Sequence, residues 1–352
     1  MKPFNIRDPL QIIAFYTYGT NTHLYARGRA LEDENINLSA KSPWKLLLNT
    51  WRRFDTDKVG NSPVSLVLPD GTTFDAMTDE DGFFLIDAQH TSLEPFANSE
   101  GWVPYEIYYS AVEQSKRVKK ENRFPGEFLI PSEKAEFGVI SDIDDTILHT
   151  GVVSSLKWQV LKNTIFKRPE KRIPLEGAAT FLSLLHAGGN GSSANPIFYV
   201  SHSPWNLYRY LLFFLEKNNF PKGPILLRTF RSFLLRKKSR EKEKPQKQKE
   251  ILNILRTYPD MPFILIGDSG ERDADIYIEI AETHPNRVLA IYMRSVRHRK
   301  RHLRVKGLFE NYKTTPVLLA KDSDELIAHA KKHGFIAGEV VKTTHEFPHR
   351  SD

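Results

Sequence analysis

The chain has 352 residues, 40% of them hydrophobic, and no cysteine, which excludes disulfide bonds and thiolate metal sites. The first residues lack the apolar core of a signal peptide, and the longest apolar run, residues 211–215, is far shorter than the roughly 20 residues that cross a bilayer. With a net charge of +7 and an isoelectric point of about 9.2, we expect a cytoplasmic or membrane-peripheral protein of about two domains that favours anionic partners.

Residues 1–132 have the pattern of a β-rich domain. Short apolar or alternating segments are separated by turn sequences such as Pro69-Asp70-Gly71. The expected strands are residues 12–18, 23–29, 64–68, 72–76, 83–86 and 104–109. Residues 43–54 are typical of a helix, and the charged segment 113–126 is typical of a link or an exposed hairpin. Several short strands at this spacing predict a small sandwich-like domain.

From residue 133 onward, strands alternate with helices. The expected strands are residues 137–142, 196–201, 225–228, 263–268 and 288–293, and the expected helices are about 175–187, 205–218, 245–257 and 271–284. Near-continuous apolar strands separated by helices predict a parallel sheet that is covered on both faces. We expect this α/β domain to span residues 133–320, followed in residues 321–352 by a C-terminal helix and a tail.

Polar side chains stand at the carboxyl ends of three predicted strands. Asp142, Asp144 and Thr146 form a D-x-D-x-T motif at the first, Ser201 ends the second, and Asp268 ends the fourth. The carboxyl ends of parallel strands meet at one edge of a sheet, where such folds place their chemistry. Crowded carboxylates at a buried strand end repel one another unless a cation or hydrogen bonds compensate them. A Mg²⁺ site with a nucleophilic aspartate is therefore our hypothesis, and a simple polar turn is the alternative.

The order of these motifs resembles the haloacid dehalogenase superfamily of aspartate-nucleophile phosphotransferases. The strings FGVISDIDDTI at 137–147, YVSHSPWN at 199–206 and ILIGDSG at 264–270 are similar to those of the actin-patch phosphatidate phosphatase family and its bacterial relatives. The resemblance covers residues 133–310 well, and the β-rich domain is similar with weaker motifs. It implies a haloacid-dehalogenase-like Rossmannoid sheet and a Mg²⁺-dependent phosphatase that converts phosphatidate, or a related phospholipid monoester, to diacylglycerol and phosphate.

The resemblance also implies the roles of the catalytic residues. Asp142 is the nucleophile that forms an aspartyl-phosphate, and Asp144 protonates the leaving group and then activates water. Ser201 and Lys247 bind the phosphoryl oxygens, while Thr146 fixes the loop after the nucleophile.

The same resemblance implies the metal ligands. Asp142, Asp268 and the backbone carbonyl of Asp144 hold Mg²⁺, whose preferred ligands are hard oxygen atoms. Asp273 orients metal-bound waters or Lys247, and a helix cap is the alternative for this residue.

Several assignments remain open at this point. Lys244 and Lys249 flank Lys247, and Gln246 stands where the family usually has histidine; the helical register of the following apolar residues favours Lys247. Asp145 is either a helper carboxylate or a turn former. Three further residues could line the mouth of the site or face solvent or the core: His202, Trp205 and Tyr208.

Two basic segments, residues 228–249 and 294–306, suggest contact with an anionic membrane. The segments 147–195 and 202–244 are too short for a large cap domain, so we expect an open site, which fits a bulky substrate or a site that works at a surface. No zinc module or helix-turn-helix spacing supports nucleic acid as the anionic partner. Two alternatives remain: a phosphatase for nucleic-acid ends or soluble phosphometabolites, and a non-catalytic adaptor. The intact acidic motif argues against the adaptor, and nothing in the sequence determines the oligomeric state.

Overall fold

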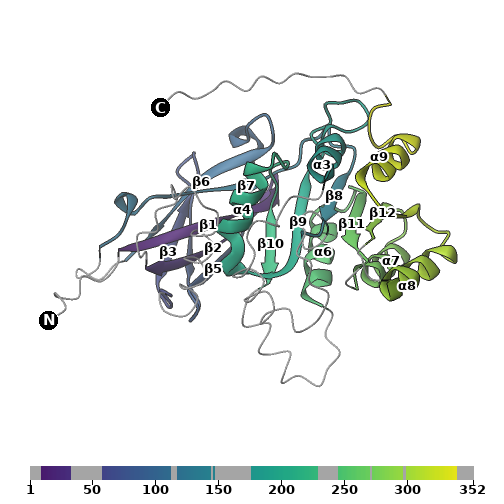
Figure 1. Cartoon of the computed structure of the whole chain (residues 1–352). Helices are drawn as coiled ribbons and strands as arrows, with labels where there is room; N and C mark the ends of the chain where they lie inside the picture. The colour runs from purple at the N-terminus through teal and green to yellow at the C-terminus, as the bar shows by residue number, and fades with distance from the viewer. Residues whose placement is uncertain are drawn as a thin grey trace.

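Among the described residues, the first part of the chain forms one curled sheet of seven strands (Figure 1). The structure is a computed structural model that describes residues 9–32, 58–111, 117–143, 146, 176–228, 245–269, 272–295 and 299–338. The strands are β1 (Leu10–Thr20), β2 (His23–Glu32), β3 (Pro63–Val67), β4 (Thr73–Met77), β5 (Phe83–Gln89), β6 (Trp102–Tyr109) and β7 (Phe124–Leu129). Their order is β4-β3-β6-β7-β1-β2-β5, and only β1 and β7 pair in parallel.

The predicted β-rich domain is thus confirmed, and its strands belong to a single sheet. The end strands β4 and β5 contact each other, so the sheet nearly closes into a barrel. Alternate residues point inward and form one core, which includes Leu24, Val64, Ile107 and Phe128. The expected helix at 43–54 lies outside the described residues.

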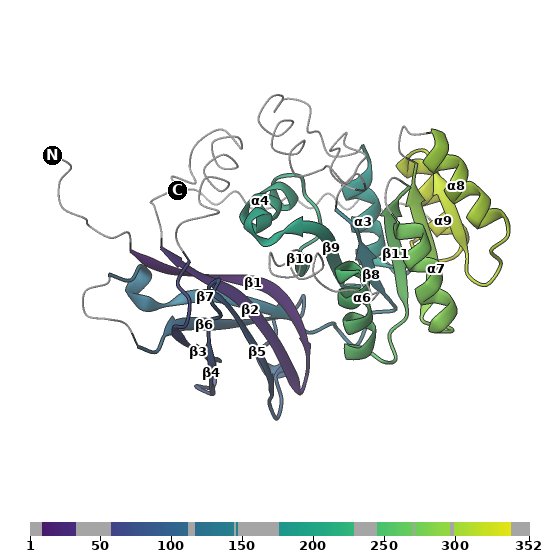
Figure 2. The same ribbon diagram turned by 90° about the horizontal axis from the view of Figure 1, so that it is seen from below.

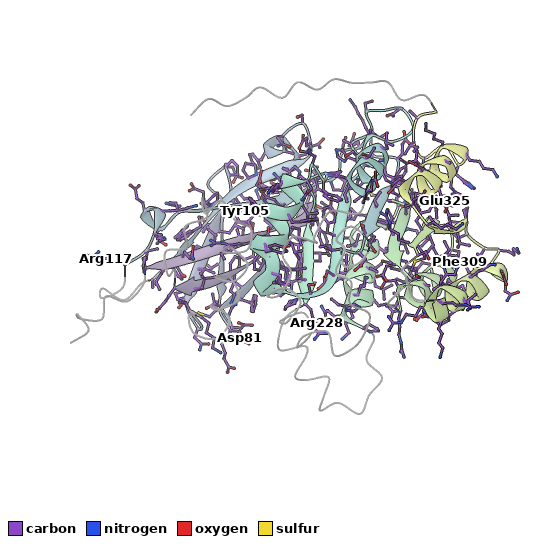
Figure 3. The ribbon with its side chains drawn as sticks, in the orientation of Figure 1. Asp81, Tyr105, Arg117, Arg228, Phe309 and Glu325 are labelled. Carbon is purple, nitrogen blue, oxygen red and sulfur yellow. The ribbon has the colours of Figure 1, made fainter. Side chains whose placement is uncertain are left out.

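Strand β7 begins at Phe124, inside the segment that the sequence predicted as a link or an exposed hairpin. The described part of that segment before Phe124 contains a short 3-10 helix, Lys120–Asn122, whereas Pro125-Gly126 belongs to the strand. The ring of Tyr105 on β6, labelled in Figure 3, crosses directly over Gly126. A Cβ atom at position 126 would lie 2.3 Å from that ring, so the close pairing of β6 and β7 requires glycine.

In the second part of the chain, the described residues form a parallel sheet of six strands, which Figure 2 shows from another side. The strands are β8 (Gly138–Ser141), β9 (Ile197–Pro204), β10 (Ile225–Arg228), β11 (Phe263–Asp268), β12 (Val288–Arg294) and β13 (Val317–Ala320). They lie in the order β10-β9-β8-β11-β12-β13, and every neighbouring pair is parallel. The sequence predicted all of them except β13, which is short and half-buried at the edge.

Helices cover both faces of this sheet. One face is covered by α3 (Ala178–Ala187), α4 (Tyr208–Lys217) and α9 (Ser323–Lys332), and the other by α6 (Gln246–Thr257), α7 (Asp273–Thr283) and α8 (Arg299–Glu310). Alternate strand residues point to opposite faces of the sheet and belong to different cores, as Val139 and Ile140 on β8 illustrate. The predicted α/β class is confirmed. No helix among the described residues is long and apolar enough to span a bilayer.

The two sheets meet at the edge strand β10. Strand β1 of the β-rich domain lies against β10, and it contributes Phe15 to the core on one face of the parallel sheet and Tyr18 to the core on the other. Further along the chain, α9 packs on β13 and α3, so residues 323–332 belong to the same packed unit. The domain boundaries at residues 132 and 320 stay predictions.

Candidate active site

The predicted site residues lie at the carboxyl edge of the parallel sheet, which Arg228 marks at the end of β10 in Figure 3. Asp142 follows β8 directly, and its backbone N–H donates to the carbonyl of Ile266 on β11 at 2.8 Å. Asp268 is the last residue of β11. On the other side of β8, Ser141 is level with Tyr199 of β9, so Ser201 comes close to the level of Asp142. Ladder hydrogen bonds of the central strands therefore set the spacing of these residues.

Lys247 connects two carboxylates in the interior. Its ammonium donates to Oδ1 of Asp142 at 2.7 Å and to Oδ1 and Oδ2 of Asp273 at 2.8 Å and 2.7 Å. All three side chains are fully buried. Lys247 stands in the first turn of α6, and Asp273 is the first residue of α7. The positive ends of both helix dipoles thus face the carboxylates and help to stabilise their charge.

The third carboxylate completes an oxygen-rich cluster. Carboxylate oxygens of Asp142, Asp268 and Asp273 lie within 4.8 Å of one another, and all three residues are buried. Three carboxylates buried so close together repel one another, and a divalent cation between them would relieve that repulsion. Hard carboxylate oxygens are the donors that Mg²⁺ prefers. The donor set therefore fits a hard divalent cation, such as the predicted Mg²⁺.

The position of Asp273 depends on a glycine and a tyrosine that the sequence reasoning did not assign. A Cβ atom at Gly267 would lie 2.7 Å from Oδ2 of Asp273 and 3.0 Å from the ring of Tyr277. The Tyr277 hydroxyl donates to the carbonyl of Ile266 at 3.1 Å, and burial raises the pKa of Tyr277 well above its ordinary value. In the sequence, the only signal for Gly267 was its position directly before Asp268, the last residue of a predicted strand.

Hydroxyl groups hold Asp142 and the backbone around Ser201. Thr146 donates from Oγ1 to Oδ2 of Asp142 at 3.3 Å, and Ser141 donates from Oγ to the carbonyl of Asp142 at 2.9 Å. Ser201 is buried, and its Oγ accepts the backbone N–H of Ser203 at 2.8 Å. The two oxygens of Asp142 are thus oriented by different partners, Lys247 and Thr146.

The structure brings together Asp142, Thr146, Lys247, Asp268 and Asp273, with Ser201 on the neighbouring strand. Their chemical roles stay predictions.

The open assignments have different outcomes. Asp144 and Asp145 lie outside the described residues, as does Lys244. Lys249 is exposed, whereas Lys247 points into the cluster.

The residues that follow Ser201 mostly pack inward. Trp205 and Tyr208 are buried in the core, and Trp205 stacks on Phe15 with ring centres 4.2 Å apart. This result supports core packing over a place at the mouth of the site. His202 is half-buried on β9.

Arg294 is a buried residue that the sequence reasoning placed in a basic surface segment. It is level with Asp268 in the sheet and donates to the carbonyl of Glu176 at 3.2 Å. It also lines a cavity of about 10 Å³ with Ser141 and Thr146. Burial lowers the pKa of Arg294 from its ordinary value, but arginine remains charged. Its position at the end of a predicted strand was the only signal in the sequence.

Comparison with known proteins agrees with this geometry. Residues 137–295 match the sequence model of the family described as phosphatidate phosphatase APP1, catalytic domain. This part of the chain belongs to that family. The family resemblance seen in the motifs is therefore confirmed, and the match contains every described residue of the acidic cluster.

Two fungal relatives extend the match beyond the catalytic domain. The chain is 32% identical over 252 residues to phosphatidate phosphatase APP1 of Saccharomyces cerevisiae, which covers 68% of this chain and 39% of the relative. It is 27% identical over 225 residues to an uncharacterised protein of Schizosaccharomyces pombe, with coverage of 63% and 34%. The chain thus spans little more than a third of the length of these relatives.

Proposed function

We propose that this protein is a Mg²⁺-dependent phosphatase of the haloacid dehalogenase type that hydrolyses phosphatidate, or a related phospholipid monoester, to diacylglycerol and phosphate. The observation that carries the proposal is the buried cluster of Asp142, Lys247, Asp268 and Asp273 at the carboxyl edge of a parallel sheet, within a segment of the APP1 catalytic-domain family. The lipid substrate is supported by the name of the yeast relative.

The proposed reaction has two steps at phosphorus. A carboxylate oxygen of Asp142 attacks, the ester P–O bond breaks, and Asp144 gives its proton to the departing alkoxide. Asp144 then takes a proton from water, whose oxygen attacks the aspartyl-phosphate and releases phosphate, so that Asp142 is restored. Ser201 and Lys247 bind the phosphoryl oxygens in both steps.

The carboxylates of Asp142, Asp268 and Asp273, together with the backbone carbonyl of Asp144, would hold Mg²⁺. The bound cation supplies charge neutralisation, which lets an anionic nucleophile approach an anionic phosphate. The contact between Lys247 and Asp142 at 2.7 Å supports the proposed role of the lysine in binding phosphoryl oxygens.

A direct assay measures phosphate release from phosphatidate in mixed micelles and from a small soluble phosphomonoester, each with Mg²⁺ and with EDTA. We expect Mg²⁺-dependent release from both, and no turnover by Asp142→Asn. If no phosphomonoester is hydrolysed with Mg²⁺, the enzyme proposal is wrong. Hydrolysis of soluble esters or nucleic-acid ends, but never of phosphatidate, would contradict only the lipid substrate.

We also propose that α8 contacts an anionic membrane. Arg299, Lys300 and Leu303 are exposed near its start, and the Leu303 side chain is 53% exposed. His302, in the first turns of α8, contacts Ser295, with His302 Nδ1 2.7 Å from Ser295 Oγ. Ser295 directly follows β12, at the carboxyl edge of the sheet. Cations around an apolar side chain at the edge that holds the acidic cluster suit an anionic bilayer.

Vesicle co-sedimentation tests this contact without relying on catalysis. Removing two cations in Arg299→Ala/Lys300→Ala should cost about 2 kcal/mol, or roughly 30-fold in affinity for anionic vesicles. The matched control, Lys331→Ala/Lys332→Ala, removes the same charge in the last turn of α9. Equal loss in both double variants would mean that binding depends only on net charge and not on α8.

A further inference from the structure

The β-rich domain touches both elements that carry the predicted phosphate-binding side chains. On the β9 side, Phe15 stacks on Trp205, with an angle of 21° between the rings. On the α6 side, Asn253 donates to the hydroxyl of Tyr18 at 2.6 Å, and Tyr258, which follows α6, donates to the carbonyl of Gly19 at 2.9 Å. Tyr18 is fully buried, so this part of the junction is packed like a domain core.

Arg27 on β2 reaches both elements at once. Its guanidinium carbon lies 4.9 Å from the centre of the Trp205 ring, within the range of a cation–π interaction. Its Nη1 atom lies 3.5 Å from Oε1 of Glu250 on α6. The side chains of Arg27 and Glu250 are only 14% and 9% exposed. The guanidinium therefore connects two segments that are distant in the sequence.

The two contacts lie very close to Ser201 and Lys247. Trp205 stands just after β9, four residues beyond Ser201. Glu250 lies on α6 one turn after Lys247, and it also accepts a hydrogen bond of 2.9 Å from Gln246, the residue before the lysine. A displacement of either contact would be passed directly to one of the phosphate-binding side chains.

We propose that Arg27 is a positioning residue of the active site: it holds the turn after β9 at a fixed distance from the first turn of α6. Because Ser201 and Lys247 lie next to these two turns, Arg27 also sets the distance between them. The β-rich domain is therefore a structural part of the catalytic unit. This inference rests on the proposed phosphatase function. Without Arg27, the buried carboxylate of Glu250 loses its cation and is driven toward water, which pulls on the first turn of α6.

The test compares Arg27→Gln with a second cation at the same junction. Lys222 is paired with Glu127 at 2.6 Å, and its ammonium lies 4.2 Å from the ring centre of Trp102 on β6. Lys222→Gln thus removes an ion pair and a cation–π contact between the same domains, just before the amino end of β10 rather than at Trp205 or Glu250. Both variants are checked for folding by urea unfolding and are assayed with Mg²⁺ and a soluble phosphomonoester.

We expect Arg27→Gln to lower kcat about 10- to 100-fold and to change KM by less than about threefold, because misplacement of phosphate-binding groups weakens mainly the transition state. Lys222→Gln should lower stability but keep kcat. Arg27→Lys, which keeps the charge but not the planar group, should recover part of the loss and covers the case in which Arg27→Gln does not fold. Arg27→Gln/Glu250→Gln should be more active than Arg27→Gln, since no unpaired buried carboxylate remains.

Wild-type kcat in Arg27→Gln, or equal kcat losses in Arg27→Gln and Lys222→Gln, would overturn the positioning role. A wild-type protein that hydrolyses no phosphomonoester with Mg²⁺ would instead overturn the phosphatase proposal, so the two failures are distinguishable.

Discussion

Gly267→Ala tests whether the packing beneath the acidic cluster sets catalytic geometry. The new Cβ would lie 2.7 Å from Oδ2 and 3.0 Å from Cβ of Asp273, and an ordinary contact begins at 3.4 Å. The Asp273 carboxylate must therefore retreat by about 0.7 Å, which stretches its hydrogen bonds of 2.7 Å and 2.8 Å to Lys247. Overpacking of this kind costs about 1–3 kcal/mol of stability.

The effect on activity should be larger than the effect on stability suggests. A misplacement of about 1 Å in a catalytic group can cost about 100-fold in rate, so we expect Gly267→Ala to lower kcat by roughly 30- to 100-fold. The assay is turnover of a soluble phosphomonoester with Mg²⁺, accompanied by urea unfolding to measure the stability change.

A matched control uses the other end of the same sheet. A Cβ at Gly138 on β8 would lie 2.4 Å from the ring of Phe263, so Gly138→Ala creates a similar clash at the amino edge. It should destabilise the fold while kcat of the folded protein stays near that of the wild type. The reasoning is refuted if Gly267→Ala keeps full kcat, or if both alanine variants lose it equally.

Three further predictions concern charge. Mg²⁺ at 100 times its Kd should add about 2.7 kcal/mol and raise Tm by several degrees, and Asp268→Asn should abolish that shift in a thermal melt. Lys247→Met should lose about 3–5 kcal/mol in urea unfolding with EDTA, because two buried carboxylates lose their ammonium, and Mg²⁺ should restore part of it. Burial and nearby Glu127 raise the pKa of Tyr16 to about 12; only the unfolded state ionises near pH 10, so stability should fall between pH 10 and 12, and less steeply in Tyr16→Phe.

The sequence predicted the parallel sheet because buried strands are almost continuously apolar and their helices are amphipathic. That signal fails for β13, which has four residues and is half-buried, and for α8, whose cations dominate and whose fully buried side chain is Val305. At β7, Pro125-Gly126 ends the segment predicted as a link or an exposed hairpin but belongs to a strand, where Gly126 leaves room for the ring of Tyr105. Sequence patterns thus predict a helix or strand well only where the element's own residues show a clear pattern of buried apolar side chains.

The sequence predicted the side chains of the candidate site but not the packing that positions them. Asp142 and Asp268 were found because the ends of predicted parallel strands meet, and helical register selected Lys247 over Lys249. The close approach of Gly267 to Asp273 was not predictable, since it depends on how tightly α7 packs on β11.

Arg27 could not have been found by the same reasoning. No spacing or periodicity relates a β2 residue to the turn after β9 and the first turn of α6; only the packing of one domain on the other does.

The residues that the sequence predicted and those that it did not differ for one physical reason. The predicted phosphate- and metal-binding groups are single side chains on separate elements, so something must fix each element relative to the others. Ladder hydrogen bonds fix β8 and β11, and the close contact at Gly267 fixes α7. Helix α6 has no ladder; it packs on β9 and β10, and its first turn is linked to Asp142 by Lys247 and to the β-rich domain by the pair of Glu250 and Arg27. Because that last contact comes from the β-rich domain, the parallel sheet alone does not contain everything that sets the geometry of its own active site.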